Sequence, residues 1–252
     1  MGSRRLWWPT FAVAVAGLLV TTGCAPTATG AGAAGTPMGA SASATPGQAA
    51  GTAPGPADAA TPGQAAGTVR CTYRRSGEPA KPVDPPPGVA AATGTTAVML
   101  SFAVGNVTVT MDRAAAPCTV NSFESLAEQG FYTGTRCHRL ADNGLFMVQC
   151  GDPTGTGAGG PGYTFADEVD PAATYPAGTV AMANSGPDTN GSQFFLVYQD
   201  SRLPAAYTVF GRMDEASTSV IGRIAAEGQD GSWGDGTGRP NNLAAITAVR
   251  LG

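Results

Sequence analysis

The sequence predicts a mostly β protein, in which a closed antiparallel barrel capped by two helices follows a disordered N-terminal tether. Many short apolar runs with the composition of β-strands are separated by turn residues, and only two segments have a helical pattern. Closure into a barrel removes exposed strand edges, so this architecture is typical of such a pattern. The 36 glycines and 20 prolines crowd into the first third of the chain and a few loops. The folded part is therefore shorter than the chain.

Charge and histidine content exclude two classes of function. The formal net charge is −4 and the sequence has no basic block, which argues against nucleic acid as the main partner. His138 is the one histidine of the chain. A histidine-rich metal site is therefore excluded, and a serine–histidine–aspartate scheme has a single candidate base.

Residues 1–24 have the pattern of an export signal. Two arginines precede a short apolar run, Phe11–Val20, which is followed by Thr-Thr-Gly and Cys24. The run is too short to predict a membrane span. Its end resembles a bacterial lipobox, although a threonine stands where leucine or valine is usual. We expect an exported protein, lipid-anchored through Cys24 to the outer face of the cell membrane; an uncleaved anchor and simple secretion are the alternatives.

Residues 25–68 predict a flexible linker. They consist of Ala, Gly, Thr, Pro, Ser and Gln with one methionine and one charge, Asp58, and the nonapeptide ATPGQAAGT occurs at residues 44–52 and 60–68. The repeats have too few large apolar side chains to form a core that offsets the loss of chain entropy. We expect a tether that holds the next domain away from the membrane. Binding by the repeats themselves is the alternative.

Residues 69–94 predict an arm attached to the following domain. The arm contains several prolines and could be a polyproline ligand for another module, but it also contains a cysteine. With Cys24 set aside, an even number of cysteines in an exported chain predicts two disulfides, of which one would staple the arm to the core. Zinc is disfavoured because no pair has the close spacing of a structural site. All three pairings remain open among the four cysteines, Cys71, Cys118, Cys137 and Cys150.

The globular domain is expected at residues 95–252. Two strand-like runs, Val98–Val104 and Val107–Met111, flank Gly105-Asn106, which predicts a two-residue hairpin turn there. Pro117 is typical of a helix start, and this helix has an apolar face formed by Val120, Phe123 and Ala127. The later elements are a hairpin of Cys137–Ala141 and Phe146–Cys150, a central hairpin within Val180–Val197, a strand at Tyr207–Met213, a helix near Thr218–Glu227 and a strand at Ala244–Leu251.

Three patterns that could indicate other chemistry are not supported by their context. Gly155–Gly160 fits the G-x-G-x-x-G pattern, but Pro-Gly follows it where a nucleotide-binding fingerprint needs a helix. Ser185 and Ser192 lie near the predicted groove and His138 is available as a base, but the sequence has no G-x-S-x-G elbow and no obvious orienting acid. The carboxylates of Asp167, Glu168 and Asp170 lie on a loop-like segment and are expected at a solvated edge rather than as an acid–base pair.

The central stretch Val180–Val197 has the composition of a peptide-binding groove. Its sequence, VAMANSGPDTNGSQFFLV, places small residues and amides beside two phenylalanines. Amides can pair with the main chain of an extended peptide, and an aromatic wall can receive an apolar ring.

Three motifs resemble those of cyclophilin-type peptidyl-prolyl isomerases. The stretch MANSGPDTNGSQFF resembles the MANAGPxTNGSQFF signature, and CHRLADNGLFMVQCGD, from Cys137 to Asp152, resembles FHRIxxGFMxQGGD with two extra residues in the turn. YTVFG at Tyr207–Gly211 is the third. The motifs occur in order over residues 95–252, and PCTVNSF and CHRL are similar to stretches of exported actinobacterial cyclophilins.

This resemblance implies an eight-stranded barrel and isomerisation of X-Pro bonds without a cofactor or metal. It implies that Arg139 is the catalytic guanidinium. The alternatives without a catalytic role are a surface ion pair for Arg139 and a place in the barrel core for the apolar residues. The implied peptide-binding residues fall into two groups: a proline pocket of Phe146, Met147, Phe195, Leu203 and Tyr207, and backbone-holding residues Gln149, Ala183, Asn184, Ser185 and Gln193.

Three departures from the family pattern limit what is carried over. Arg202 stands where many members have tryptophan, which argues against strong binding of ciclosporin, and Tyr207 replaces a pocket histidine. Cys150 replaces the first glycine of QGGD and fits a disulfide at the edge of the site. Despite these three departures, the sequence keeps the arginine of the motif, Arg139.

The sequence therefore predicts a monomeric isomerase that assists the folding of extracytoplasmic proteins by acting on their proline-containing segments. A non-catalytic proline-peptide binding module or holdase is the alternative, since it would keep the groove but not need the arginine. A stalked structural lipoprotein is disfavoured, because its groove would have an arbitrary composition.

Overall fold

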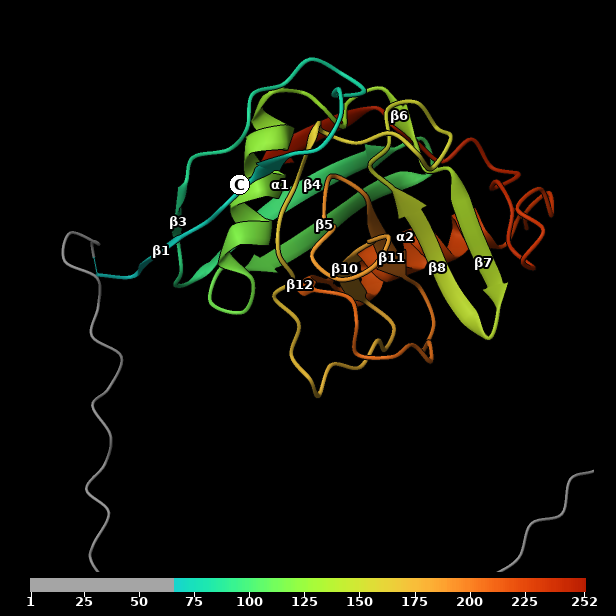
Figure 1. The fold of residues 1–252 in the computed structure, drawn as a ribbon. Helices are drawn as coiled ribbons and strands as arrows, with labels where there is room; N and C mark the ends of the chain where they lie inside the picture. The colour runs from blue at the N-terminus through green and yellow to red at the C-terminus, as the bar shows by residue number, and fades with distance from the viewer. Residues whose placement is uncertain (1–65) are drawn as a thin grey trace, which may run out of the picture. The chain divides into compact units, whose positions relative to one another are not determined.

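The computed structural model describes residues 66–252, whose main feature is one antiparallel sheet of eight strands (Figure 1). Along the sheet the strands follow the order β14-β4-β5-β12-β10-β11-β8-β7, and all pairs are antiparallel. Their bounds are β4 Thr95–Phe102, β5 Gly105–Asp112, β7 Arg139–Asn143, β8 Leu145–Cys150, β10 Thr179–Met182, β11 Phe194–Val197, β12 Val209–Met213 and β14 Ala248–Leu251.

The sheet is curled, and its two end strands, β7 and β14, do not pair with each other. The outer edge of β7 is instead covered by a loop, because Leu140 forms an isolated antiparallel bridge with Gly238. The predicted mostly β class with eight antiparallel strands and two helices is confirmed, whereas a closed barrel slightly overstates the closure.

The alternation of side chains fixes the register of the first hairpin. In β5 the apolar residues Val107, Val109 and Met111 are buried while the residues between them are exposed, as expected for a strand with one face on the core. Phe102 pairs with Gly105, so the turn consists of Ala103-Val104. The turn predicted at Gly105-Asn106 is therefore wrong by two residues.

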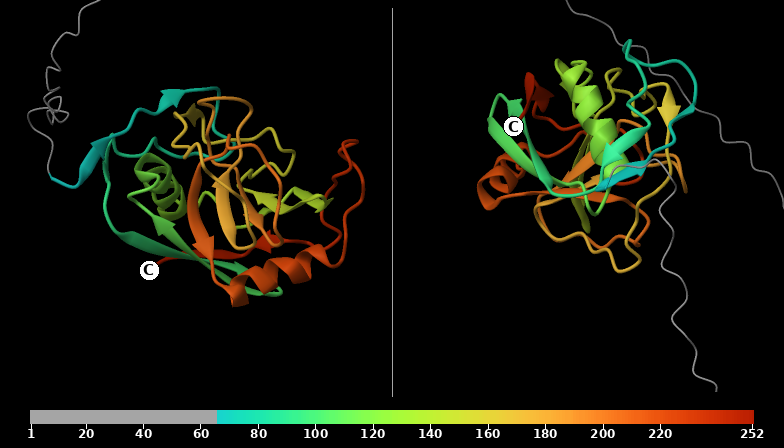
Figure 2. Two further views of the ribbon diagram at one scale, coloured as in Figure 1. Left: turned by 90° about the horizontal axis from the view of Figure 1, so that it is seen from below. Right: turned by 90° about the vertical axis from the view of Figure 1, so that its left-hand side faces the viewer.

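The two helices, α1 (Pro117–Glu128) and α2 (Glu215–Ala225), are separated by strands of the curled sheet (Figure 2). Helix α2 is capped by Asp214, whose side chain accepts a hydrogen bond of 2.7 Å from the Ser217 amide. Helix α1 has no such cap from its own N-cap residue. Both helices were predicted, and both bury an apolar face.

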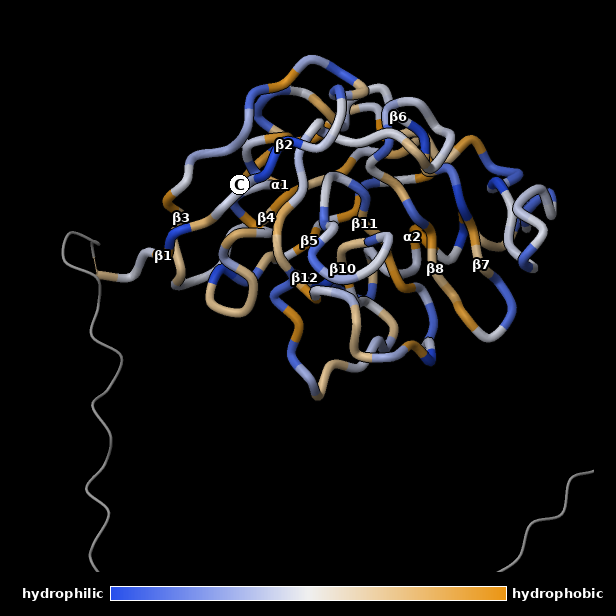
Figure 3. Tube along the Cα trace, in the orientation of Figure 1, coloured by the Kyte–Doolittle hydropathy of each residue, from blue (hydrophilic) through white to orange (hydrophobic). Residues whose placement is uncertain are grey.

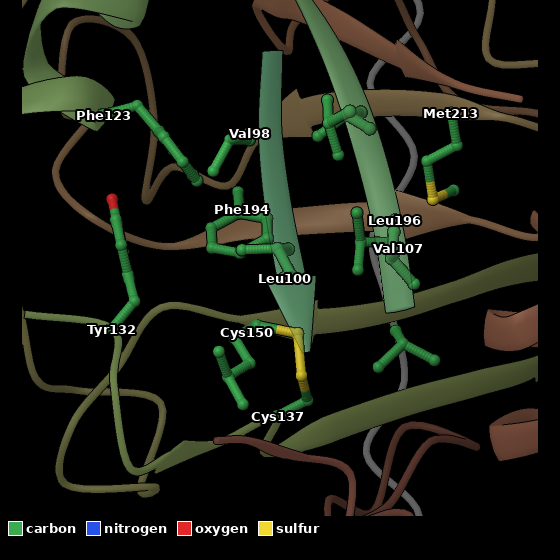
Figure 4. Close-up of a cluster of buried hydrophobic side chains, with 14 of the residues drawn as sticks. Val98, Leu100, Val107, Phe123, Tyr132, Cys137, Cys150, Phe194, Leu196 and Met213 are labelled. Carbon is green, nitrogen blue, oxygen red and sulfur yellow. A yellow bond between two sulfur atoms is a disulfide. The ribbon is translucent and has the colours of Figure 1, made fainter. Parts of the chain in front are cut away.

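The core lies between the sheet and the helices. Orange apolar residues in Figure 3 lie along the strands and on the helices, whereas many connecting loops are pale or blue. Phe123 of α1 stacks on Tyr132 at 4.7 Å and meets the edge of Phe194 at 5.3 Å. The Cys137–Cys150 disulfide lies beside Leu100 in this core (Figure 4).

The arm is ordered and packs along α1. Its strands β1 (Thr68–Arg70) and β3 (Val89–Ala91) pair with each other, and β2 (Arg74–Arg75) pairs with β9 (Tyr163–Thr164). A second disulfide joins Cys71 to Cys118 on α1. The prediction of two disulfides, one of which staples the arm to the core, is confirmed. A further small sheet consists of β6 (Thr135–Arg136) and β13 (Ala245–Ile246).

The predicted signal segment, Cys24 and the linker up to residue 65 lie outside the described residues. Thr68, which we assigned to the linker, is the first residue of β1. Within residues 66–252, no helix has both the length and the apolar character needed to cross a membrane.

Candidate active site

Arg139 is the first residue of β7 and pairs across the hairpin with Gln149 of β8. Its Nε donates to Thr237 Oγ1 at 2.8 Å, and its Nη2 donates to Asp235 Oδ2 at 2.7 Å. The Trp233 ring lies 6.0 Å from the guanidinium carbon, within the range of a cation–π contact. The side chain of Arg139 is 27% exposed. The ion pair that we considered as the alternative to a catalytic role is therefore present, and it holds the guanidinium in a defined place.

Arg139 also lines a small cavity of about 100 Å³. Its apolar wall includes Phe195, which is 4% exposed and meets Tyr207 edge to face at 5.5 Å. Tyr207 is fixed by Tyr175, whose hydroxyl donates to the Tyr207 carbonyl at 3.0 Å. The lining residues are Arg139, Leu145, Met147, Gln149, Ala183, Asn184, Phe195, Leu203 and Tyr207.

Phe146 is the predicted pocket residue that the structure places elsewhere. Successive residues of a strand point to opposite faces, so Leu145, Met147 and Gln149 share the cavity face of β8. The Phe146 ring packs against Tyr198 at 5.9 Å instead. In this structure Leu145 therefore lines the small cavity and Phe146 does not.

A larger cavity of about 500 Å³ adjoins the small one. Gln149, Ala183 and Asn184 line both cavities, while Ser185 and Gln193 line the larger one only. All five predicted backbone-holding residues therefore line the larger cavity, and three of them also line the small one.

Two glutamines form the bridge between the cavities. Gln149 Nε2 donates to Gln193 Oε1 at 2.8 Å. Gln193 Nε2 donates to the carbonyls of Gly157 and Gly159 at 2.8 and 2.9 Å. These bonds fix both amides and attach the groove to the glycine-rich loop.

The glycine-rich loop wraps around the carboxylate of Asp152. The amides of Thr154, Thr156, Gly157 and Gly159 donate to this carboxylate. Burial raises the pKa of Asp152, but the hydrogen bonds from Thr154 and from the loop amides outweigh it and lower the pKa below its ordinary value. The loop amides that could bind a nucleotide phosphate therefore already bind the carboxylate of Asp152.

The other titratable groups considered from the sequence have structural surroundings. His138 is 2% exposed, and its ring nitrogens have no partner at hydrogen-bond geometry in residues 66–252. Glu168 accepts from the amides of Cys118 and Thr119 at 2.9 and 2.8 Å, which caps α1. No acid–base pair forms between Glu168 and its neighbours, since the amide of Asp188 and the side-chain amide of Asn190 hold the Asp167 carboxylate.

Sequence reasoning missed three residues that contact or surround Arg139, namely Trp233, Asp235 and Thr237. They follow α2 in a loop rich in glycine and aspartate, a composition that indicates only turns. It also missed Leu145 and the arm residues that line the larger cavity, Ser76, Gly77 and Glu78. No local pattern marks these residues as part of a site.

Comparisons with known proteins agree with this geometry. The family model described as "Cyclophilin type peptidyl-prolyl cis-trans isomerase/CLD" matches residues 97–250. A probable peptidyl-prolyl cis-trans isomerase B of Mycobacterium leprae is 46% identical over 73% of this chain and 67% of its own length. Its Mycobacterium tuberculosis counterpart is 45% identical, over 72% of this chain and 63% of its own length. The chain therefore matches about two thirds of the length of these relatives.

A solved structure gives the same result for the fold. The cyclophilin-type isomerase of Cryptosporidium parvum has a TM-score of 0.55 and 28% identity, and the match covers 63% of this chain and 98% of that one. A second structure of that protein, in the presence of the dipeptide Ala-Pro, has a TM-score of 0.54 and the same identity.

Proposed function

The chain belongs to the family of cyclophilin-type peptidyl-prolyl cis-trans isomerases, and on that premise we propose that it isomerises X-Pro bonds of extracytoplasmic proteins with Arg139 as the catalytic group. The observation that carries this proposal is that Arg139 lines a small cavity together with the apolar side chains of Phe195 and Leu203 and with Gln149 and Asn184. The cavity receives the proline ring, and the amides bind the peptide backbone.

The mechanism follows from the electronic structure of the amide. Resonance opposes rotation about an X-Pro bond with a barrier of about 20 kcal/mol, so the uncatalysed reaction takes tens to hundreds of seconds. In the twisted transition state the proline nitrogen loses conjugation and gains a lone pair that accepts hydrogen bonds. A guanidinium beside that nitrogen stabilises the twisted state more than the planar one, which is catalysis by differential binding.

Export is supported by three observations on the chain. The two disulfides are typical of an oxidising compartment. The first 24 residues have the pattern of a signal that ends in Cys24, the proposed site of a lipid anchor, and a low-complexity linker follows. We propose that the isomerase domain works as a monomer, tethered at the outer face of the membrane, on proline-containing segments of exported proteins.

The experiment that tests the reaction is cis–trans exchange of an Ala-Pro peptide, measured by NMR. We expect fast exchange with the wild-type chain and a loss of about 10²-fold or more with Arg139→Ala, the range for removing an electrostatic stabiliser. Arg136→Ala is the matched control, because Arg136 is an exposed arginine three positions away that does not line either cavity. It should exchange the peptide at the wild-type rate.

The alternative function is a proline-peptide binding module or holdase, which the amide-lined groove would also serve. Peptide titrations followed by NMR separate the two. If the wild type and Arg139→Ala both bind the peptide but neither accelerates exchange, the isomerase proposal fails and the binding module replaces it.

A further inference from the structure

The arm forms one wall of the larger cavity. Ser76, Gly77 and Glu78 line it together with Asn184 and Gln193 of the central hairpin. These three arm residues lie outside residues 97–250, which match the family model. The wall therefore lies outside the segment that the family model matches.

Hydrogen bonds hold this wall on both sides of the three residues. The Ser76 amide donates to the Gly162 carbonyl at 2.9 Å, and the Ala80 amide donates to the Gly160 carbonyl at 2.8 Å. Gly162 has φ +77°, and a Cβ there would lie 2.9 Å from the backbone nitrogen of Pro79. The glycine thus permits a close approach that fixes the arm against the loop.

Glu78 gives the wall its charge. It is the only acidic or basic residue among those that line the larger cavity. Within residues 66–252 its carboxylate has neither a hydrogen bond nor an ion pair, although two exposed arginines, Arg74 and Arg75, precede it in the arm. An exposed, unpaired carboxylate beside a peptide groove attracts a cationic side chain.

We propose that Glu78, on the arm wall of the larger cavity, selects lysine or arginine at the substrate position whose side chain enters this cavity. This inference rests on the proposed function, because it places the proline in the small cavity. Both cavities share Gln149, Ala183 and Asn184. A peptide with its proline in the small cavity therefore continues past the larger one.

The test compares kcat/KM for Ala-Pro peptides that carry Lys, Gln or Glu at each successive position on either side of the proline. At one position we expect the wild type to prefer Lys over Gln by about 1.5- to 5-fold, the range for an exposed ion pair. Salt should weaken this preference. Glu78→Gln should abolish it and Glu78→Lys should favour the Glu peptide.

Glu128→Gln is the matched control, because Glu128 is exposed at the far end of α1 and lines neither cavity, yet the change in net charge is the same. This variant should keep the preference for lysine. An equal preference in the wild type and Glu78→Gln, at every position, would overturn the inference.

Two failures are distinguishable. If the wild type isomerises the uncharged Ala-Pro peptide but shows no charge preference, the role of Glu78 is wrong and the proposed function stands. If it isomerises no peptide, the proposed function fails, and the Kd of Lys and Gln peptides for the wild type and Glu78→Gln then decides whether Glu78 selects a cation.

An independent observation concerns the loop that contacts Arg139. Leu140 and Gly238 exchange backbone hydrogen bonds of 2.7 and 3.2 Å, which places residues 235–237 beside the first residue of β7. Asp235 Oδ1 accepts from the amide and the hydroxyl of Thr237 at 3.0 and 2.6 Å. The Thr237 hydroxyl therefore donates to Asp235 and accepts from Arg139 Nε.

We infer that Asp235 and Thr237 are positioning residues for the catalytic guanidinium. Their contacts hold Nε and Nη2 of Arg139, whereas Nη1 has no hydrogen-bond partner within the described part of the chain. Because the guanidinium is planar, fixing two of its nitrogens fixes the direction of the third. Nη1 is then free to donate to the substrate, so this inference also rests on the proposed function.

The test uses Thr237→Val, which keeps the size of the side chain but loses its hydroxyl, and Thr237→Ser, which restores the hydroxyl. We expect Thr237→Val to lower kcat about tenfold with KM unchanged, in the range for a lost hydrogen bond to a charged group, and Thr237→Ser to recover most of it. The NMR signal of the Arg139 Nε–H reports the hydrogen bond without reference to activity. If this signal shifts in Thr237→Val while kcat does not change, the positioning role is overturned; a signal unaltered by Thr237→Val overturns the contact itself.

Discussion

His138 and Arg139 are neighbours in the sequence and differ in how they respond to pH. A guanidinium is charged at every physiological pH. Burial lowers the pKa of His138, and the nearby charge of Asp152 opposes this effect only in part. The ring is therefore neutral near neutral pH. We expect isomerase activity to be insensitive to pH near neutrality, whereas the stability of the fold is sensitive to mild acid.

The first prediction is that the folded state loses stability as the pH falls below the ordinary histidine pKa of about 6.5. The unfolded chain takes up a proton there, whereas folded His138 does so only at lower pH, so protonation favours unfolding. Above about pH 6.5 the imidazole is neutral in the folded and the unfolded state, so this loss of stability does not occur there. His138 is the one histidine of the sequence, so no other imidazole contributes.

Thermal unfolding between about pH 7 and pH 5 measures this effect. The Tm of the wild type should fall across this window, while that of His138→Gln should change much less. Equal slopes for the two proteins would show that His138 does not carry the effect, whatever the absolute stability of the variant.

At the scale of elements, α1 depends on a cap that is distant in the sequence. Its N-cap residue, Ala116, has no side chain that can accept a hydrogen bond, and Glu168 accepts from the amides of Cys118 and Thr119 in its place. A carboxylate at this end also interacts favourably with the helix dipole. The segment that we interpreted as a solvated edge thus stabilises a helix.

The second prediction is that Glu168→Ala lowers the free energy of unfolding by about 1–2 kcal/mol, the usual cost of losing an N-terminal cap. Glu128→Ala is the control, because this exposed glutamate lies at the other end of α1, where a negative charge is unfavourable. It should leave the stability unchanged or slightly raised. Urea unfolding of both variants checks the prediction, and similar losses for both would contradict the capping role.

The first hairpin shows why a local turn signal can be placed wrongly. Gly-Asn is a strong turn pair, yet the turn falls at Ala103-Val104. Arg223 of α2 donates to the Val104 carbonyl at 3.0 Å, and Val220 packs close to Gly105. The packing of a helix more than a hundred residues away holds the turn in its place, and the local pattern contains no information on that helix.

At the scale of the whole molecule, the arm is attached along the length of α1. The Cys71–Cys118 disulfide joins it near the start of the helix. Near the end of the helix Lys81 donates to the Gly130 carbonyl, and Gln129 accepts from the Asp84 amide at 2.7 Å. The wall of the larger cavity therefore depends on contacts that lie outside the cavity.

The third prediction concerns the double variant Cys71→Ser/Cys118→Ser. The disulfide closes a segment of 47 residues, and in the chain-entropy model its loss costs up to about 4 kcal/mol. Exchange of an Ala-Pro peptide should persist under conditions where the variant is folded, because Arg139 and the Cys137–Cys150 disulfide are unaltered.

Hydrogen exchange of the Ser76 and Ala80 amides measures the loosening of the arm in this variant. Both amides should exchange faster than in the wild type, and the preference for a lysine peptide should weaken. Unaltered protection of these two amides would show that hydrogen bonds alone hold the arm.

The sequence by itself determined most strands of the eight-stranded sheet, the start of α1, the number of disulfides and most residues of the small cavity. These features depend on local patterns: alternation of side chains, a proline at a helix start, and motifs in which the functional residues are close in sequence. Met147, Gln149, Asn184 and Phe195 could be found in this way because each lies on a strand or hairpin whose sequence is itself distinctive.

Only the tertiary structure decided how distant segments complete the site. It determined which cysteines pair, and it placed Leu145 rather than Phe146 on the wall of the small cavity. It also brought Glu78 to the larger cavity, and Asp235 and Thr237 to Arg139. Asp235 is 96 residues from Arg139, and its neighbours have an ordinary turn composition. Their proximity results from the curl of the sheet and from the edge that β7 leaves open to the loop. Such contacts depend on the path of the whole backbone, which no local pattern of residues specifies.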